Sequence, residues 1–311
     1  MTLSQGPLAT EGEQPPMTSR VDPERGMREV VEFFGSGQSR LFGCCHLPAG
    51  RSRGGVIVCP SVQAEFHRNY RREVELGRHL AAHGFAVQRF HYRGTGHSDG
   101  ETSDVTFETM IEDAISAAEH LRERSSVDLL GFIGTRSGAL VAAAAASQSD
   151  GSPVALWEPV TDPNRYVRDI LRAGLIHELR KGVHDNRSRN EQIEELLSTG
   201  RLDVLGYTIN RGLYESLVRR ELDGELGSTP RPLLLVEIAR RSELRHEYSA
   251  AVERWTSRGF DVSTHIVSSM AEPWWFVRGR SIEEEASLTR DLVQTTVAWF
   301  SRTLASTGVS G

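Results

Sequence analysis

The chain has 311 residues, of which 38% are apolar, and a formal net charge of −6 at neutral pH. Its length suits one large domain or two small ones, and its negative charge argues against the basic surface that a nucleic-acid partner requires. No apolar run approaches the roughly 20 residues that span a bilayer. We therefore expect neither a nucleic-acid partner nor a membrane partner.

The cysteines and residues 1–25 indicate in which cellular compartment the protein is expected. Cys44, Cys45 and Cys59 are odd in number and form no C-x-x-C pair, so we expect no disulfide framework and a reducing, cytoplasmic setting. Cys59 ends an apolar run, which favours a buried structural thiol over a nucleophile. Residues 1–25 are rich in polar and turn-forming residues and contain no apolar signal segment, which predicts a disordered tail.

Beyond this tail, strand-like and helix-like stretches alternate along the chain. Strands are predicted at 28–34, 39–47, 55–60, 85–91, 127–134, 153–160, 232–238 and 261–267. Helices are predicted at 69–83, 106–124, 243–258 and 282–303, and a further alanine-rich helix directly after Gly138. Asn69 is expected to cap the first helix, which leaves 61–68 as a loop. The alternation indicates a mostly parallel sheet, and the opening hairpin indicates antiparallel strands at one edge.

The sequence Gly134-Thr135-Arg136-Ser137-Gly138 joins an apolar strand to the alanine-rich helix. This is the layout of a nucleophile elbow. Glycines are needed on both sides because the turn is tight and the helix packs close to its strand. The middle residue of an elbow is normally Ser, Cys or Asp. Arg136 cannot attack a carbonyl, because its guanidinium stays protonated at any accessible pH.

Several other segments, taken with the elbow, resemble one superfamily. They are Pro60, Glu65, the pair Arg71 and Arg72, the R-G-T-G-H-S-D-G loop at 93–100, and L-W-E-P-V at 156–160. The set resembles the α/β-hydrolase superfamily, its serine-aminopeptidase-like branch, and most closely the exosortase A system-associated hydrolases. The resemblance implies an α/β-hydrolase fold with a core of 26–162 and 229–305. The charged segment 163–228, predicted to be helical, would form a cap, and the activity would be that of an esterase, thioesterase or peptidase.

The same resemblance implies a triad in the order Ser, acid, His along the chain. The acid is expected after the strand at 232–238, where arginines dominate and Glu243 is the nearest carboxylate. The histidine is expected after the strand at 261–267, where the chain continues S-S-M-A-E-P-W-W. His265 lies within the strand, which favours a structural role. All three triad positions are therefore predicted to be replaced.

Two readings of Arg136 remain open with equal weight. At the start of a helix, a guanidinium and the helix dipole together favour an anionic ligand or an oxyanion. Alternatively Arg136 forms an internal salt bridge to Glu158 or Glu272, because a buried arginine must be paired.

The neighbours of Arg136 supply the other candidate site residues. The N–H of Ser137 is a natural oxyanion donor, with Ser61 or Val62 as the second donor, and Ser137 as a displaced nucleophile is a minor alternative. Glu65, Glu158 and Glu272 are the carboxylates expected near the carboxyl ends of the strands. They would act as acid or base in an apolar pocket, or else pair with arginine. His67 is a candidate base or a surface residue, and Trp274 lines a pocket or the core.

These residues support two functional hypotheses. In the first, the protein is an enzyme without a Ser-His-Asp triad that acts on an anionic, carbonyl-containing small molecule, namely an ester, thioester or amide. In the second, it is a catalytically silent relative that binds a ligand or a protein partner. No cofactor is expected, and no metal, because the histidines lack a spacing such as H-E-x-x-H. A homodimer is left open.

Overall fold

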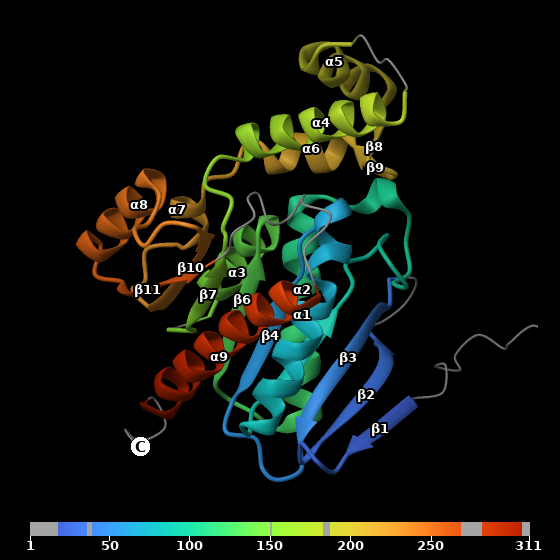
Figure 1. Ribbon diagram of the computed structural model, residues 1–311. Coiled ribbons are helices and arrows are strands. Elements are labelled where there is room, and N and C mark those ends of the chain that lie inside the picture. The colour runs from blue at the N-terminus through green and yellow to red at the C-terminus, as the bar shows by residue number, and fades with distance from the viewer. Residues whose placement is uncertain (1–17, 36–38, 150, 183–186, 269–281, 307–311) are drawn as a thin grey trace, which may run out of the picture.

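The computed structural model describes residues 18–35, 39–149, 151–182, 187–268 and 282–306. Its centre is a sheet in the order β1-β2-β3-β5-β4-β6-β7-β10-β11 (Figure 1). The strands are β1 (Thr18–Asp22), β2 (Met27–Phe34), β3 (Leu41–Pro48), β4 (Gly55–Cys59), β5 (Ala86–Phe90), β6 (Leu130–Thr135), β7 (Val154–Trp157), β10 (Pro232–Ala239) and β11 (Asp261–Ser268). From β5 to β11 all neighbours are parallel, whereas β1, β2 and β3 are antiparallel. The predicted mostly parallel sheet with an antiparallel edge is confirmed.

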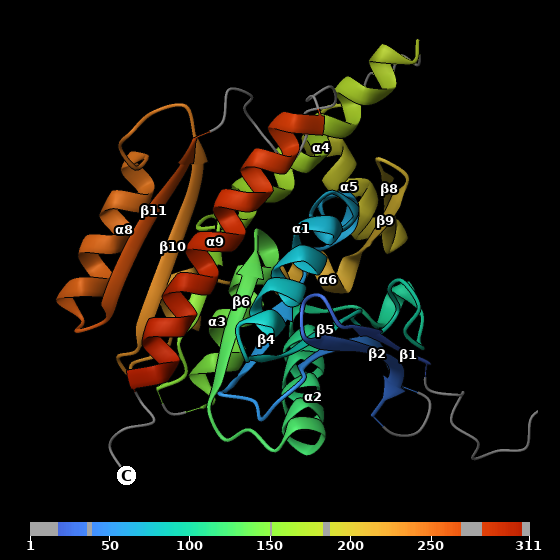
Figure 2. The same ribbon diagram turned by 60° about the horizontal axis from the view of Figure 1, so that its bottom comes forward.

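Helices cover both faces of this sheet. They are α1 (Gln63–Ala82), α2 (Phe107–Ser125), α3 (Ser137–Ser147), α8 (His246–Ser257) and α9 (Ile282–Ser306). Figure 2 shows α1 and α9 side by side over one face, while α2, α3 and α8 share the core of the other face. Successive residues of β4 alternate between the two cores: Val56 and Val58 face α1, and Ile57 and Cys59 face the opposite side. This burial on both faces explains why the central strands read as continuous apolar runs.

Two features near the start of the chain differ from the sequence prediction. Thr18–Asp22 forms the edge strand β1, paired with β2 from Thr18↔Val31 to Asp22↔Met27, so the prediction of a disordered tail was wrong there. Its side chains are mostly exposed. Because backbone pairing rather than apolar burial holds β1, its composition gave no strand signal. Residues 1–17 lie outside the described residues.

The first long helix also begins earlier than predicted. Helix α1 starts at Gln63, so Asn69 is a buried interior residue rather than the cap. Its amide donates to the carbonyl of Glu65 (3.0 Å) and to Ser61 Oγ (3.2 Å). The N-cap position is Val62, whose side chain accepts no hydrogen bond, so no cap signal marks the true start. Glu65 and His67 consequently lie on the helix and not on a loop.

Residues 163–228, called the insertion below, lie between β7 and β10. They contain α4 (Pro163–Arg180), α5 (Arg189–Thr199), β8 (Arg201–Val204), β9 (Tyr207–Asn210), α6 (Arg211–Leu217) and α7 (Leu222–Glu225). The prediction of an entirely helical segment missed the β8–β9 hairpin, whose turn is made possible by the positive φ angles of Leu205 and Gly206. Figure 1 shows α4, α5, α6 and the β8–β9 hairpin of the insertion beyond one end of the sheet, whereas α7 packs beside α3.

Contacts identify which end of the sheet the insertion covers. Gln63 Nε2 donates to the carbonyl of Thr208 (3.2 Å), which joins β9 to the start of α1. Because α1 follows β4, this is the end at which the parallel strands finish and where sites in such sheets gather. No helix in the described ranges is long and apolar enough to cross a membrane.

Candidate functional site

Arg136 occupies a strained turn between β6 and α3. Its φ and ψ are 55° and −118°, a conformation that a non-glycine residue adopts only when its surroundings impose it. A Cβ on Gly134 would lie 2.1 Å from the Gly138 carbonyl oxygen, and one on Gly138 would lie 2.3 Å from that of Cys59. Only glycine fits at either position. The backbone therefore has the shape of the elbow that the sequence indicates, with an arginine at its apex.

The Arg136 side chain is 10% exposed and contacts other protein groups. Nε donates to Glu65 Oε1 (3.2 Å), Nη1 donates to the carbonyl of Glu158 (3.1 Å), and the guanidinium carbon lies 5.4 Å from the centre of the Tyr166 ring. The salt bridge is thus with Glu65, whereas the expected partner Glu158 contributes its backbone oxygen. The other expected partner, Glu272, lies outside the described residues. Burial alone would lower the pKa of Arg136, but the Glu65 carboxylate and its neighbours raise it overall.

Ser137 begins α3 and is buried. Its Oγ accepts a hydrogen bond from the N–H of Val62 (3.3 Å) and lies 3.4 Å from the Tyr166 hydroxyl, which donates to Glu65 Oε2 (2.9 Å). The Val62 N–H, an expected oxyanion donor, is therefore directed at a side chain of the elbow. This bond also brings the N-termini of α1 and α3 together, because Val62 precedes the first residue of α1.

Glu158 follows β7 and has a positive φ of 47°. Its carboxylate is fully buried: Oε1 accepts from the N–H of Ile238 (2.5 Å), and Oε2 accepts from Arg245 Nη2 (2.8 Å) and lies 3.4 Å from the Tyr248 hydroxyl. Burial raises the pKa of Glu158 to about 7, against the opposing effect of Arg245. A carboxyl group that titrates near neutral pH therefore lies directly beside the elbow.

The arginines that follow β10 pair with the buried carboxylates Glu158 and Glu237. Arg245 donates from its backbone N–H (2.8 Å) and Nε (2.9 Å) to the buried Glu237, to which Arg241 Nη2 also donates (2.5 Å). Glu243, the carboxylate nearest to the position where a triad acid would lie, is exposed. We call the whole set the elbow charge cluster; it consists of Glu65, Arg136, Glu158, Glu237, Arg241 and Arg245.

No histidine is paired with Ser137 in the part of the chain that the structure describes. His265 lies on β11, and its Nε2 is 3.1 Å from Asp291 Oδ1 on α9. His67 is exposed on α1, with its ring 5.6 Å from that of Tyr207. The chain contains no histidine after His265. Trp274, predicted to line a pocket, lies outside the described residues.

Comparisons with known proteins agree with this architecture. A family model described as serine aminopeptidase, S33, matches residues 50–199. An esterase from Pyrococcus furiosus is similar in structure, with 15% identity, coverage of 96% of this chain and 99% of that chain, and a TM-score of 0.60. A proline iminopeptidase from Mycobacterium smegmatis gives 11% identity, coverage of 89% and 99%, and a TM-score of 0.57. Est1E from Butyrivibrio proteoclasticus gives 14% identity, coverage of 86% of this chain and 99% of that chain, and a TM-score of 0.54. No curated protein matches the chain in sequence.

The chain has the α/β-hydrolase fold. The α/β-hydrolase fold that the resemblance implied is thus confirmed. The narrower resemblance to exosortase A system-associated hydrolases stays a prediction. At such low identities the structural similarity establishes the fold and not the reaction.

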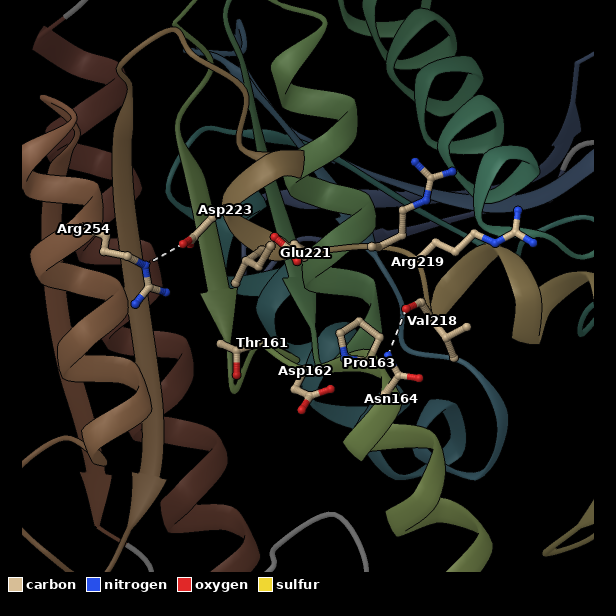
Figure 3. Close-up of a pocket in the computed structure, with 11 residues that line it drawn as sticks. Thr161, Asp162, Pro163, Asn164, Val218, Arg219, Glu221, Asp223 and Arg254 are labelled. Atoms are coloured by element: carbon tan, nitrogen blue, oxygen red, sulfur yellow. Dashed lines mark hydrogen bonds and ion pairs between the residues drawn. The ribbon is translucent and has the colours of Figure 1, made fainter. Parts of the chain in front are cut away.

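In this α/β-hydrolase fold, a polar cavity of about 320 Å³ lies at the base of the insertion. It is lined by the start of α4, the α6–α7 connection and α8, with acidic and basic residues in equal number. Figure 3 shows Arg254 paired with Asp223 on one side (2.6 Å) and Asn164 bound to the carbonyl of Val218 on the other (3.1 Å). None of its lining residues belongs to the elbow charge cluster, so this cavity is a separate hollow.

The sequence reasoning missed four residues of the site: Tyr166, Glu237, Arg245 and Tyr248. Glu237 carried a usable signal, because a lone carboxylate within the apolar run L-L-L-V-E-I must be paired when buried. Tyr166 and Tyr248 carried none. Each reaches the site from the N-terminal part of a helix, α4 or α8, whose position only the tertiary structure defines.

Proposed function

We propose that this protein acts on an anionic, carbonyl-containing small molecule, an ester, thioester or amide, without forming an acyl-serine. The observation that carries the proposal is the retained elbow with Arg136 at its apex. The strained backbone and the glycine contacts are those of a reactive turn, yet the residue presented is a fixed cation. A preorganised cation at this point stabilises negative charge instead of making a covalent bond.

The surroundings of Arg136 favour an anion. The N-termini of α1 and α3 meet at the Val62–Ser137 hydrogen bond, and both helix dipoles place partial positive charge there. The elbow charge cluster has three guanidinium groups and three carboxylates, so it is neutral with Glu158 ionised and has a charge of +1 with Glu158 protonated. With a Glu158 pKa of about 7, the positive form is populated near neutral pH.

The remaining steps are assigned to neighbouring groups. The N–H of Ser137 belongs to the first turn of α3, where a helix provides no internal acceptor, and we propose that it polarises the substrate carbonyl. Glu158 is the carboxyl proposed to move the proton as water attacks. Ser61, Glu65, His67 and Trp274 are proposed as substrate contacts and Glu272 as a further acid or base. Residues 163–228 are proposed as the cap that excludes bulk water. We further propose a cytoplasmic setting and kinship with the exosortase-linked branch.

A specific observation favours a second candidate, the catalytically silent relative. Both carboxylate oxygens of Glu158 and two groups of the Arg136 guanidinium already have protein partners. A catalytic role requires that a ligand displace some of these bonds. A silent protein would keep them and use the elbow charge cluster to fix the fold, while a ligand or a partner protein binds elsewhere on the insertion side.

The test compares wild type with Ser137→Ala, Arg136→Lys and Arg136→Ala. Each protein is assayed against a panel of anionic acyl esters, thioesters and amides and is treated with a fluorophosphonate probe. Turnover that survives Ser137→Ala, without labelling of the wild type, supports the proposal. Arg136→Lys keeps the charge but loses the planar fork, so we expect it to retain binding better than Arg136→Ala.

Two outcomes overturn the proposal. Labelling of Ser137 with loss of turnover in Ser137→Ala would identify a displaced serine nucleophile. Absence of turnover across the panel, with the fold of the wild type intact, would favour the silent relative. Circular dichroism and urea unfolding of each variant separate loss of function from loss of folding.

A further inference from the structure

A second group of chemically reactive side chains lies far along the sheet from the elbow. Glu32 on β2, Cys45 on β3 and His120 on α2 each place one ligand atom so that all three atoms lie within 4.8 Å of one another. Glu32 Oε1 and His120 Nε2 are 3.1 Å apart. None of these residues belongs to the elbow charge cluster, and the proposed reaction does not use them.

We infer that Glu32, Cys45 and His120 form a binding site for one Zn²⁺ ion. A carboxylate oxygen, a thiolate sulfur and an imidazole nitrogen are the three kinds of ligand that zinc takes from proteins. The Cys45 thiol releases its proton to solvent when the metal binds. The two negative ligands then neutralise the dication, and a water or the nearby Gln88 oxygen completes a four-coordinate shell.

The strand register places the ligands on one face. Val30 pairs with Cys45 and Glu32 with Gly43, so Glu32 and Cys45 are diagonal neighbours whose side chains share a face. Gly43 keeps this space open, since a Cβ there would lie 2.3 Å from Gln88 Nε2. The Cys45 thiol donates a hydrogen bond to the Gln88 side-chain oxygen (2.6 Å), and metal binding would replace this bond.

Outer contacts orient two of the ligands. Arg124 Nη2 donates to Glu32 Oε2 (2.8 Å), the oxygen that does not face His120, and so leaves Oε1 directed inward. The His120 ring stacks on Phe34, with ring centres 4.6 Å apart and planes 12° from parallel. Such support of a ligand by a second layer of residues is typical of metal sites.

The residues of this site are fully or mostly buried. Cys45 and Gln88 are fully buried, and the side chains of Glu32 and His120 are only 13% and 17% exposed. Without a metal these groups are paired by the contacts of Glu32 with His120 and Arg124 and by the hydrogen bond from the Cys45 thiol to Gln88. The observation that points to a metal is the convergence of three different ligand atoms within 4.8 Å of one another.

The three ligands come from separate elements, so no linear spacing reveals them. The prediction of no metal rested on the absence of a motif such as H-E-x-x-H, and a site assembled by tertiary structure escapes that test. Bound zinc would tie the β2–β3 hairpin at the edge of the sheet to α2.

The experiment uses the full chain, freed of metal with a chelator under reducing conditions, and titrates it with Zn²⁺ and with Co²⁺. We expect one equivalent to bind by calorimetry, a thiolate-to-cobalt charge-transfer band in the near ultraviolet, and a higher melting temperature with zinc. Cys45→Ser and His120→Gln should each weaken zinc binding at least about tenfold, and Cys45→Ser should remove the band.

Cys44→Ser is the matched control, because Cys44 is adjacent in the strand and its side chain belongs to the opposite face. It should leave the affinity and the band unchanged. The inference is overturned if the folded wild type binds no stoichiometric zinc, if Cys44→Ser is as damaging as Cys45→Ser, or if His120→Gln binds as tightly as wild type. His120 is partly exposed, so His120→Gln is expected to fold. It therefore tests the inference even if Cys45→Ser does not fold.

Discussion

Arg136 Nε lies 3.2 Å from Glu65 Oε1 and joins the apex of the elbow to the first turn of α1. The two residues are 71 positions apart in the sequence. Both are almost fully buried, so this is an interior ion pair whose desolvation must be offset by close contact and further hydrogen bonds. The Tyr166 hydroxyl supplies one such bond to the other oxygen of Glu65.

Removal of the Glu65 carboxylate should therefore be strongly destabilising. Glu65→Leu leaves a buried guanidinium without the carboxylate, and we expect a loss of about 3 kcal/mol in the free energy of unfolding. Urea unfolding followed by circular dichroism measures it. The double variant Glu65→Leu/Arg136→Leu should recover part of the loss, because no charge is then left unpaired.

An exposed ion pair provides the control for this prediction. Arg165 and Asp169 on α4 lie 3.9 Å apart with side chains 70% and 53% exposed. Asp169→Ala should change the free energy of unfolding by less than about 0.5 kcal/mol. Asp169 is the residue changed because Arg165 also pairs with Glu247 (3.5 Å). Equal effects at the two sites would show that the Arg136–Glu65 pair is solvated in solution.

Glu158 should make stability depend on pH near neutrality. Its pKa in the folded protein is about 7, above the ordinary value of 4.5, because burial favours the protonated form. Between these two values the folded state binds more protons than the unfolded state, so stability is greatest at the acid end and falls as the pH rises. The loss attributable to this group is on the order of 3 kcal/mol.

The measurement is a series of urea unfolding curves from pH 5 to pH 8. Glu158→Gln cannot ionise, and its stability should vary less over this range. Buried Glu73 on α1 also has a pKa raised to about 7 by burial, so the variant should keep the part of the slope that Glu73 produces. A pH profile identical to that of the wild type would mean that Glu158 does not titrate in this window.

Gly138→Ala should damage the elbow itself. The added Cβ would lie 2.3 Å from the Cys59 carbonyl oxygen and 2.5 Å from that of Pro60. Both are backbone atoms that cannot move without shifting α3 away from β4. We expect a loss of about 2 to 4 kcal/mol in the free energy of unfolding. Gly224→Ala in α7, where nothing lies within 4 Å of the added Cβ, should be neutral or slightly stabilising.

The sequence carried most of the fold because its signals are local. The apolar strands, the glycines of the elbow and the apolar periodicity of α2 all act within a few positions, and the structure has these elements within a few residues of the predicted bounds. The start of α1 was missed for the same reason: Val62 is held through Ser137, which is distant in sequence. The strand β1 and the β8–β9 hairpin rest on pairing, which leaves little trace in composition.

The candidate site was less predictable because its partners are distant. One of the two readings of Arg136 was a salt bridge to Glu158 or Glu272. The Glu158 carboxylate instead accepts hydrogen bonds from the N–H of Ile238 and the guanidinium of Arg245. Those contacts depend on β7 lying beside β10 in the sheet. The strand order decides this adjacency, and no motif in the chain specifies it.

Tyr166→Phe tests the link between the insertion and the elbow. The hydroxyl of Tyr166 on α4 donates to Glu65 Oε2 (2.9 Å) and lies 3.4 Å from Ser137 Oγ. Its removal leaves a buried carboxylate oxygen without this donor, which should cost about 1 to 2 kcal/mol. Amide hydrogen exchange in the first turns of α4 should become faster, because this bond anchors the insertion to the core. Tyr214→Phe on α6, a half-buried tyrosine of the same insertion, is the control and should change both measurements little.

A double-mutant cycle of Tyr166→Phe with Glu65→Gln should give a coupling of about 1 kcal/mol. Strictly additive effects on the free energy of unfolding would show that the two side chains do not interact in solution.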